Sequence, residues 1–297
     1  MAVTGLPDEF DVGYYRSLHS DLSSFTDEQA QAHYTACGIG EGRIASKLAT
    51  RNELKRYIPL VPTLEIGPYC KPFLSGPNVR YFDVLDSDAM KARLLREGLD
   101  PASADLKQIP RIDYVEPNGD LSIVGDKFGA VFSSHSIEHQ PDIIRHLQGV
   151  SRILDDGGRY YLCVPNKLYC FDHFIAESTI ADILDAYEAQ RKVHTLGNVI
   201  RHRALTTHNE TARHWDGDHK DPGYEQSISH RAMLATQEFR RANGGYVDVH
   251  AWFFTSASFR TLIGQLLDLE LISLYPERVY NSTRGSNEFM AVLRKKL

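Results

Sequence analysis

The sequence predicts an α/β fold in which a doubly wound, mostly parallel sheet carries helices on both faces. Three observations predict it: an apolar strand at residues 63–66 that runs into a glycine turn, a second strand that closes on an acid about sixteen residues later, and a strand, a helix and a strand in succession between residues 128 and 166. Strands that alternate with helices are typical of parallel sheets. The 297 residues, 42% of them hydrophobic, leave room for one large domain and an appendage.

The first strand, residues 63–66, ends at Gly67 and Pro68. Where a strand turns sharply beside a ligand, a residue without Cβ lets the backbone approach that ligand. Gly67 meets this requirement. Such turns usually carry further glycines, whereas this chain has Tyr69 and Lys71. The turn taken alone is therefore equally compatible with an ordinary connection between a strand and a loop.

A second strand, residues 78–84, closes on Asp83. Its spacing from Gly67 is that of a nucleotide-binding unit of strand, helix and strand. We expect Asp83 to face two ribose hydroxyls, because the two oxygens of a carboxylate accept both hydroxyl protons. Asp86 and Asp88 follow closely, which leaves a surface acid in a turn as the alternative.

The core is predicted to continue with a third strand at residues 109–115 and a fourth at residues 128–132. A proline near the start and apolar side chains at helical spacing predict a helix from Pro141 to Leu154, which ends at the pair Gly157-Gly158. The next strand is residues 159–166. The last elements of the core are a helix at residues 258–269 and strands at residues 271–275 and 288–293.

Together these segments resemble class I S-adenosylmethionine-dependent methyltransferases, in particular a branch that carries an S-H-x-x-E-H motif. The motif stands at residues 134–139, and the resemblance covers about 100 residues counted with the glycine turn. Two further sequences match this branch, V-P-N-K-L-Y-C-F-D at residues 164–172 and D-V-H-A-W at residues 248–252. The resemblance implies a Rossmann-like methyltransferase sheet and S-adenosylmethionine as the cofactor.

The resemblance also implies which residues hold the cofactor. These are Glu65, Gly67, Pro68, Asp83, Asp120, Leu121 and Ser134. Glu65 and Gly67 lie where the family holds the amino-acid part of the cofactor, and Asp120 and Leu121 lie where it holds the adenine. The pair Asn118-Gly119 just before them is a strong turn signal in its own right, so a simple turn is the alternative.

His135 is the predicted general base for methyl transfer to a hydroxyl, because it follows the fourth strand at the edge of the sheet where the crevice opens. In-line methyl transfer needs little covalent chemistry from the protein, so positioning supplies much of the acceleration. A structural role for His135, either in orienting the loop or in packing under the cofactor, is the alternative.

Residues 167–249 form an insertion that is too long for an ordinary loop, and we expect a helical lid with a helix at residues 178–193. Insertions at the carboxyl ends of strands lie over the crevice. The predicted substrate-binding residues are therefore His139, His208, His214, His219 and His250. Histidine and aspartate can also bind a divalent metal. The gaps of six, six and five residues between His202 and His219 do not share a helical face, and no metal is predicted.

Residues 1–50 are predicted to form a small helical module, and residues 51–297 the methyltransferase domain with its lid. Thr26, followed by Glu28-Gln29, is a predicted helix start. The module resembles one found mainly beside sugar-handling enzymes of bacterial polysaccharide assembly, on the residues His33-Tyr34, Gly38 and Glu41-Gly42-Arg43. That resemblance implies docking to glycan-assembly enzymes, and a cap over the edge of the core is the alternative.

The composition excludes several classes of function. The net charge is −6 and the basic residues are scattered, which argues against a nucleic-acid partner. No apolar run reaches membrane-spanning length, and residues 1–4 lack the features of a signal peptide. The cysteines show no paired C-x-x-C spacing, so reduced thiols and a cytoplasmic location are expected. They are Cys37, Cys70, Cys163 and Cys170.

The sequence therefore predicts an S-adenosylmethionine-dependent methyltransferase that O-methylates a sugar or glycan intermediate. Two alternatives stay open. One is a non-catalytic cofactor-binding or scaffold protein of a glycan assembly system, which the residues Tyr69 and Lys71 in place of glycines make conceivable. The other is a metal-dependent enzyme that uses the histidine-rich lid.

Overall fold

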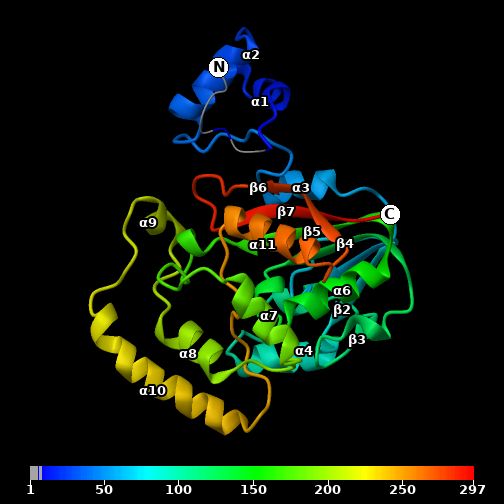
Figure 1. The fold of residues 1–297 in the computed structure, drawn as a ribbon, viewed down its shortest axis with the longest axis vertical. Helices are drawn as coiled ribbons and strands as arrows, with labels where there is room; N and C mark the ends of the chain where they lie inside the picture. The colour runs from blue at the N-terminus through cyan, green and yellow to red at the C-terminus, as the bar shows by residue number, and fades with distance from the viewer. Residues whose placement is uncertain (1–5, 7–8) are drawn as a thin grey trace.

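A seven-stranded sheet forms the centre of the computed structural model, which describes residue 6 and residues 9–297 (Figure 1). The strands are β1 (Thr63–Ile66), β2 (Val79–Asp83), β3 (Tyr114–Val115), β4 (Phe128–Ser134), β5 (Leu154–Pro165), β6 (Leu274–Tyr280) and β7 (Glu288–Lys295), in the order β3-β2-β1-β4-β5-β7-β6. The first five strands pair in parallel, and β7 is antiparallel to both β5 and β6. The predicted doubly wound α/β fold is confirmed.

The chain reverses its direction of travel across the sheet at β1. It moves outward from β1 to β2 and β3, and then returns to β4 on the other side of β1. In open α/β sheets, ligands bind outside the carboxyl ends of the strands at such a switch point. The fold itself therefore points to the ends of β1 and β4.

Helices cover both faces of the sheet, and the alternation of side chains along the strands explains how. Tyr160 and Leu162 of β5 lie in the apolar cluster that includes residues of α6, α7 and α11, whereas Tyr161 and Cys163 lie in the cluster that includes α3. Successive side chains of a strand point to opposite faces. The helices are α1 (Val12–Leu18), α2 (Asp27–His33), α3 (Arg51–Tyr57), α4 (Ser87–Arg96), α5 (Asp105–Gln108), α6 (Ile143–Ile153), α7 (Ile180–Glu188), α8 (Leu196–Ala204), α9 (Thr211–Trp215), α10 (Tyr224–Ala242) and α11 (Ser256–Asp268).

Three predicted boundaries are wrong. The strand predicted at residues 271–275 is β6, which runs from Leu274 to Tyr280. The pair Gly157-Gly158 does not end α6 but lies inside β5, where Gly157 has a φ of +72° at an irregularity in the pairing with β4. The third strand begins only at Tyr114. Before it, the Asp113 side chain accepts a hydrogen bond from the Tyr81 backbone N–H at 2.9 Å. A carboxylate therefore takes the place of a backbone carbonyl in the hydrogen bonding to β2.

The N-terminal helices form a cluster of their own and contact the β6–β7 edge of the sheet (Figure 1). Thr26 caps α2 as predicted, in a reciprocal pair of hydrogen bonds with Gln29. The Tyr34 and Tyr280 hydroxyls lie 3.3 Å apart, and Arg278 forms an ion pair with Glu9 at 2.7 Å. These contacts fix the module to β6, and its docking role stays a prediction. Residues 1–4, which carried the expectation about a signal peptide, lie outside the described part of the chain.

The insertion between β5 and α11 has structure of its own, as predicted. Figure 1 shows α8, α9 and α10 beside and below the sheet, and α7 against α6. The four cysteines are free thiols, and Cys163 packs in β5. Among the helices that the structure describes, none combines the length and the apolar character needed to cross a membrane.

Candidate functional site

A cavity of about 370 Å³ lies at the carboxyl ends of β1, β2 and β4. Its position is the switch point of the sheet, where ligand sites are expected. Its walls come from the strand ends, from α4, from the turn before β4 and from the lid. The lining residues are Ile66, Gly67, Tyr69, Phe82, Asp83, Val84, Arg93, Pro117, Asn118, Gly119, Ser134, His135, Ser136, His139, Gln140, Pro141, His146, Lys192, Tyr246 and Asp248.

The glycine turn after β1 forms one wall of the cavity. Gly67 has a φ of +69°, and a Cβ added there would lie 3.6 Å from Ser136 Oγ. Tyr69 also adopts a left-handed conformation, with a φ of +49°. The turn therefore keeps the left-handed conformation at residue 69 although the sequence lacks a second glycine there. This conformation costs a non-glycine residue roughly 1–2 kcal/mol.

Asp83 ends β2 and lines the same cavity. Its side chain is buried, and burial raises the pKa of the carboxyl above its ordinary value. The Leu85 backbone N–H donates a long hydrogen bond of 3.3 Å to Asp83 Oδ1. The carboxylate is therefore placed to accept hydrogen bonds from a ligand.

Glu65 lies on the other side of the glycine turn. Its oxygens accept hydrogen bonds from the Phe73 and Leu74 backbone N–H groups at 2.7 and 2.8 Å, and burial raises its pKa to about 7. With Pro68 it lines a second hollow, which shares Gly67, Tyr69 and Ser134 with the cavity. The observed contacts make Glu65 a brace of the loop after Gly67, and its predicted role toward a cofactor is not tested.

The predicted adenine residues sit behind the cavity wall. The Asp120 side chain accepts a hydrogen bond from the Ser122 N–H at 2.8 Å, and Leu121 is packed in the core. Neither lines the cavity, whereas Pro117, Asn118 and Gly119 just before them do. The turn signal at Asn118-Gly119 located this wall, but it gave no way to tell which residues of the turn face inward.

His135 follows β4 with a φ of +48° and lines the cavity. Its Nε2 lies 2.7 Å from Glu288 Oε2, and Glu288 also accepts hydrogen bonds from Arg51 Nε and Nη2 at 2.5 and 2.6 Å. The ring is thus held by a carboxylate that is itself fixed by a guanidinium. Sequence reasoning missed Glu288 and Arg51, because neither belongs to a motif with His135.

The carboxylate of Glu288 should stabilise the fold only above the acid range. Burial opposes its ionisation, but the hydrogen bonds from His135 and Arg51 hold the pKa of Glu288 below its ordinary value of 4.5. A depressed pKa contributes stability that is present above pH 4.5 and is lost as the pH falls. We expect Glu288→Gln to lower the free energy of unfolding at pH 7 by about 1–3 kcal/mol, since Arg51 is partly exposed and screened.

Denaturant unfolding at a series of pH values measures this effect. The difference between wild type and Glu288→Gln should shrink steadily below pH 4.5. Glu188→Gln at the exposed end of α7 makes the same change of charge and should leave stability nearly unchanged. A Glu288→Gln penalty that is as large in acid as at neutral pH would show that packing, not charge, is responsible.

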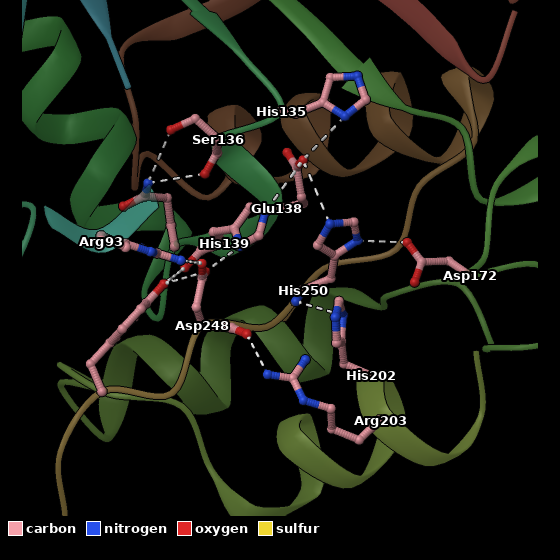
Figure 2. Close-up of polar contacts among 12 residues, drawn as sticks. Arg93, His135, Ser136, Glu138, His139, Asp172, His202, Arg203, Asp248 and His250 are labelled. Carbon is pink, nitrogen blue, oxygen red and sulfur yellow. Dashed lines mark hydrogen bonds and ion pairs between the residues drawn. The ribbon is translucent and has the colours of Figure 1, made fainter. Parts of the chain in front are cut away.

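A second histidine pair lies at the lid side of the cavity (Figure 2). His139 Nδ1 is 2.8 Å from Asp248 Oδ1, and Arg93 of α4 reaches Asp248 Oδ2 at 3.2 Å. Burial opposes the charge on His139, but Asp248 and Glu138 together raise its pKa. The hydrogen bond from His139 lowers the pKa of Asp248. Arg93 and Asp248, like Tyr246 and Lys192, had not been predicted as site residues.

His250 lies behind His139 and is buried (Figure 2). Its Nδ1 is 2.7 Å from Asp172 Oδ2, and its backbone N–H donates to His202 Nδ1 at 3.0 Å. Burial lowers the pKa of His250 to about 3 and raises that of Asp172 to about 7, so the imidazole is neutral at neutral pH. His139 and His250 thus lie together, but only His139 lines the cavity, and their predicted role in substrate binding stays a prediction.

The lid histidines form a separate stack. The His208 and His214 ring centroids lie 4.3 Å apart, those of His173 and His219 3.8 Å, and the Nδ1 atoms of His214 and His219 3.2 Å. None of these four lines the cavity described above. The assignment of His208, His214 and His219 to the acceptor therefore stays a prediction.

Comparisons with known proteins give only distant likenesses. No protein-family model matches the sequence, and no curated protein matches it. Among solved structures, a protein from Listeria monocytogenes described as an S-adenosylmethionine-dependent methyltransferase is similar with a TM-score of 0.41 and 14% identity, over 83% of this chain and 97% of its own. An S-adenosylmethionine-dependent methyltransferase from Mesorhizobium loti gives a TM-score of 0.34 and 13% identity, over 82% and 96%.

The mitomycin 7-O-methyltransferase MmcR gives a TM-score of 0.36 and 12% identity, over 97% of this chain and 61% of its own. Scores and identities this low leave the function to be argued from the residues of this chain.

Proposed function

We propose that this chain is an S-adenosylmethionine-dependent methyltransferase that transfers the methyl group to a hydroxyl of a sugar or glycan intermediate. One observation carries the proposal: the bare backbone of Gly67 and the buried carboxylate of Asp83 face a single cavity at the switch point of the sheet. That pairing suits a ligand with a ribose and an extended polar tail, because the glycine admits the tail and the carboxylate accepts the ribose protons.

The cofactor would extend along the strand ends. Asp83 accepts the two ribose hydroxyls, Gly67 and Ser134 border the amino-acid part, and Asn118 and Gly119 border the adenine. Asp120 and Leu121 support the adenine wall from behind, since one caps the following turn and the other packs in the core.

The acceptor would enter from the lid side, where the cavity wall carries hydrogen-bonding groups from Arg93, His139, Lys192, Tyr246 and Asp248. A wall of this kind suits a hydroxyl-rich acceptor, and the resemblance of the N-terminal module to glycan-associated modules supports the same class. The module would dock the enzyme to a glycan-assembly partner.

His135 acts as the base in this proposal. Its Nε2–H donates to Glu288, which leaves the lone pair of Nδ1 to take the proton from the acceptor hydroxyl as the oxygen bonds to the methyl carbon and S-adenosylhomocysteine leaves. Glu288 fixes the ring and offsets the positive charge that forms on it, in the manner of the carboxylate in a catalytic triad.

Two measurements test the proposal as a whole. Isothermal titration calorimetry with S-adenosylmethionine should show one site per chain, and incubation with methyl-labelled cofactor and a panel of nucleotide sugars should transfer label to one of them. If the cofactor binds but no member of the panel is labelled, the chain is a cofactor-binding protein and the proposed sugar acceptor is rejected. Absence of binding would overturn the proposal.

Asp83→Ala should weaken cofactor binding without unfolding the protein. It removes the acceptor of two ribose hydroxyl protons, a loss of roughly 1.5–3 kcal/mol for hydrogen bonds to a charged group, or about 10- to 150-fold in Kd. Calorimetry with S-adenosylhomocysteine measures it. Asp88→Ala on the exposed face of α4 is the matched control and should bind as the wild type does. Equal affinities for both variants would mean that Asp83 is only a turn residue.

A further inference from the structure

Glu138 is a fully buried carboxylate that is not hydrogen bonded. Its exposure is 0%, and both Oε atoms lack a hydrogen-bond partner within the part of the chain that the structure describes. It lies in the short 3-10 helix of residues Ile137–His139, between β4 and the lid. Burying a carboxylate without a partner costs several kcal/mol, so such a group is normally paired with a cation.

Three imidazole nitrogens surround this carboxylate (Figure 2). His135 Nδ1, His139 Nε2 and His250 Nε2 each lie 3.9 Å from Glu138 Oε1. These separations are too long for hydrogen bonds. Glu138, His139 and His250 also offer one ligand atom each within 4.8 Å of one another. The arrangement encloses a space that one small cation would fill.

The far side of each ring is held by a second carboxylate. His139 Nδ1 is 2.8 Å from Asp248 Oδ1, and His250 Nδ1 is 2.7 Å from Asp172 Oδ2. In neutral His139 and His250 the N–H is then on Nδ1, and the Nε2 lone pair of each of these two rings points toward Glu138. Metal-binding histidines show this arrangement, because a carboxylate on the outer nitrogen fixes the tautomer and the ring orientation.

We propose that Glu138, His139 and His250 bind one divalent transition-metal ion of the zinc class. Two imidazoles and one carboxylate suit Zn²⁺ and similar ions, and three protein ligands leave a position open for a further oxygen. His139 also lines the cavity, so the site borders it. The site does not depend on methyl transfer, and it was not predicted from the sequence.

The two separations between a histidine nitrogen and Glu138 Oε1 need a small adjustment to hold a metal. With Zn–N and Zn–O bonds of about 2.0–2.2 Å at a tetrahedral angle, ligand atoms are roughly 3.4 Å apart, so the 3.9 Å separations must close by about half an ångström. The His139 and His250 ring centroids are 4.7 Å apart with an interplanar angle of 84°. The two rings therefore lie edge to face beside Glu138.

Three other arrangements compete with this site. Asp172, His202 and His250 offer one ligand atom each within 4.8 Å, but His202 Nδ1 already accepts the hydrogen bond of the His250 backbone N–H, and a metal held there would not need Glu138. A protonated His139 could neutralise Glu138 as a plain ion pair. The lid stack of His173, His214 and His219 also brings ligand atoms within 4.8 Å. In that stack, however, His173 Nδ1 and His214 Nε2 contact the backbone oxygens of Leu168 and His208. The group also contains no carboxylate whose charge a cation would neutralise.

Zinc binding to the full chain tests the site. The protein is stripped with a chelator, dialysed, and titrated with ZnCl₂ by calorimetry, with metal content checked by mass spectrometry. We expect one zinc per chain, and a loss of affinity of more than about a hundredfold in Glu138→Gln, which removes a ligand oxygen. Asp172→Asn leaves all three ligands in place and should weaken binding by about 10- to 100-fold, as loss of an outer carboxylate does.

His214→Ala in the lid stack is the control and should bind zinc as the wild type does. The proposal is overturned if the wild type binds no zinc, or if Glu138→Gln binds zinc with the affinity of the wild type. Loss of binding in His214→Ala would place the zinc in the lid stack instead. Should Glu138→Gln fail to fold, Asp172→Asn decides, because unchanged affinity there excludes the site. Since binding is measured without acceptor or cofactor, its failure is distinct from failure of the methyltransferase proposal.

Discussion

His135→Asn is expected to bind S-adenosylmethionine with the affinity of the wild type and to transfer the methyl group about a hundredfold to ten-thousandfold more slowly. The size follows from the loss of a positioned general base. Asparagine is the suitable replacement, because His135 has a φ of +48° and asparagine tolerates the left-handed region better than alanine does. Steady-state kinetics on the acceptor found in the panel of nucleotide sugars, together with calorimetry, separates the two effects.

The control is His230→Asn on the exposed surface of α10, which should change neither quantity. A structural role for His135 gives a different pattern. If the ring only supports the cavity wall, cofactor affinity falls in His135→Asn while the rate at saturating substrate stays close to that of the wild type.

Gly67→Val should abolish cofactor binding while the protein stays folded. The valine side chain would enter the wall that Gly67 shares with Ser136, and the position has a φ of +69°, which strains a β-branched residue. We expect no heat of binding for S-adenosylmethionine at concentrations that saturate the wild type, and a loss of stability of about 1–2 kcal/mol from the backbone alone.

Gly98→Val provides the matched control. Gly98 has a φ of +95°, and an added Cβ would meet no atom within 4 Å. The control variant therefore carries similar backbone strain away from the cavity, and it should be destabilised but should bind the cofactor normally. Wild-type affinity in Gly67→Val would place the cofactor elsewhere.

Local sequence predicted the parts of the site that one strand and its following turn determine. The acid at the end of β2, the left-handed glycine after β1 and the histidine after β4 all face one cavity, because the carboxyl ends of parallel strands share an edge. Tyr69 shows how far such reasoning extends. Its φ of +49° means that the glycine-like conformation is present without the glycine.

The rest of the site depends on contacts between distant segments, which no local pattern encodes. Glu288 meets His135 only because β7 pairs with β5, and Asp248 meets Arg93 only because the end of the lid returns to α4. The lid histidines illustrate the same limit. Their spacing correctly excluded a shared helical face, but it could not show that loops would stack their rings.

The antiparallel strand β7 also sets the order in which the protein can become complete during synthesis. His135 leaves the ribosome 153 residues before its partner Glu288, so a nascent chain that ends before β7 has the histidine without its carboxylate. Until β7 arrives, β5 is an unpaired edge of the sheet, which is prone to pairing with other chains. A ribosome-bound chain therefore gains the protected edge and the oriented histidine together, once β7 has emerged.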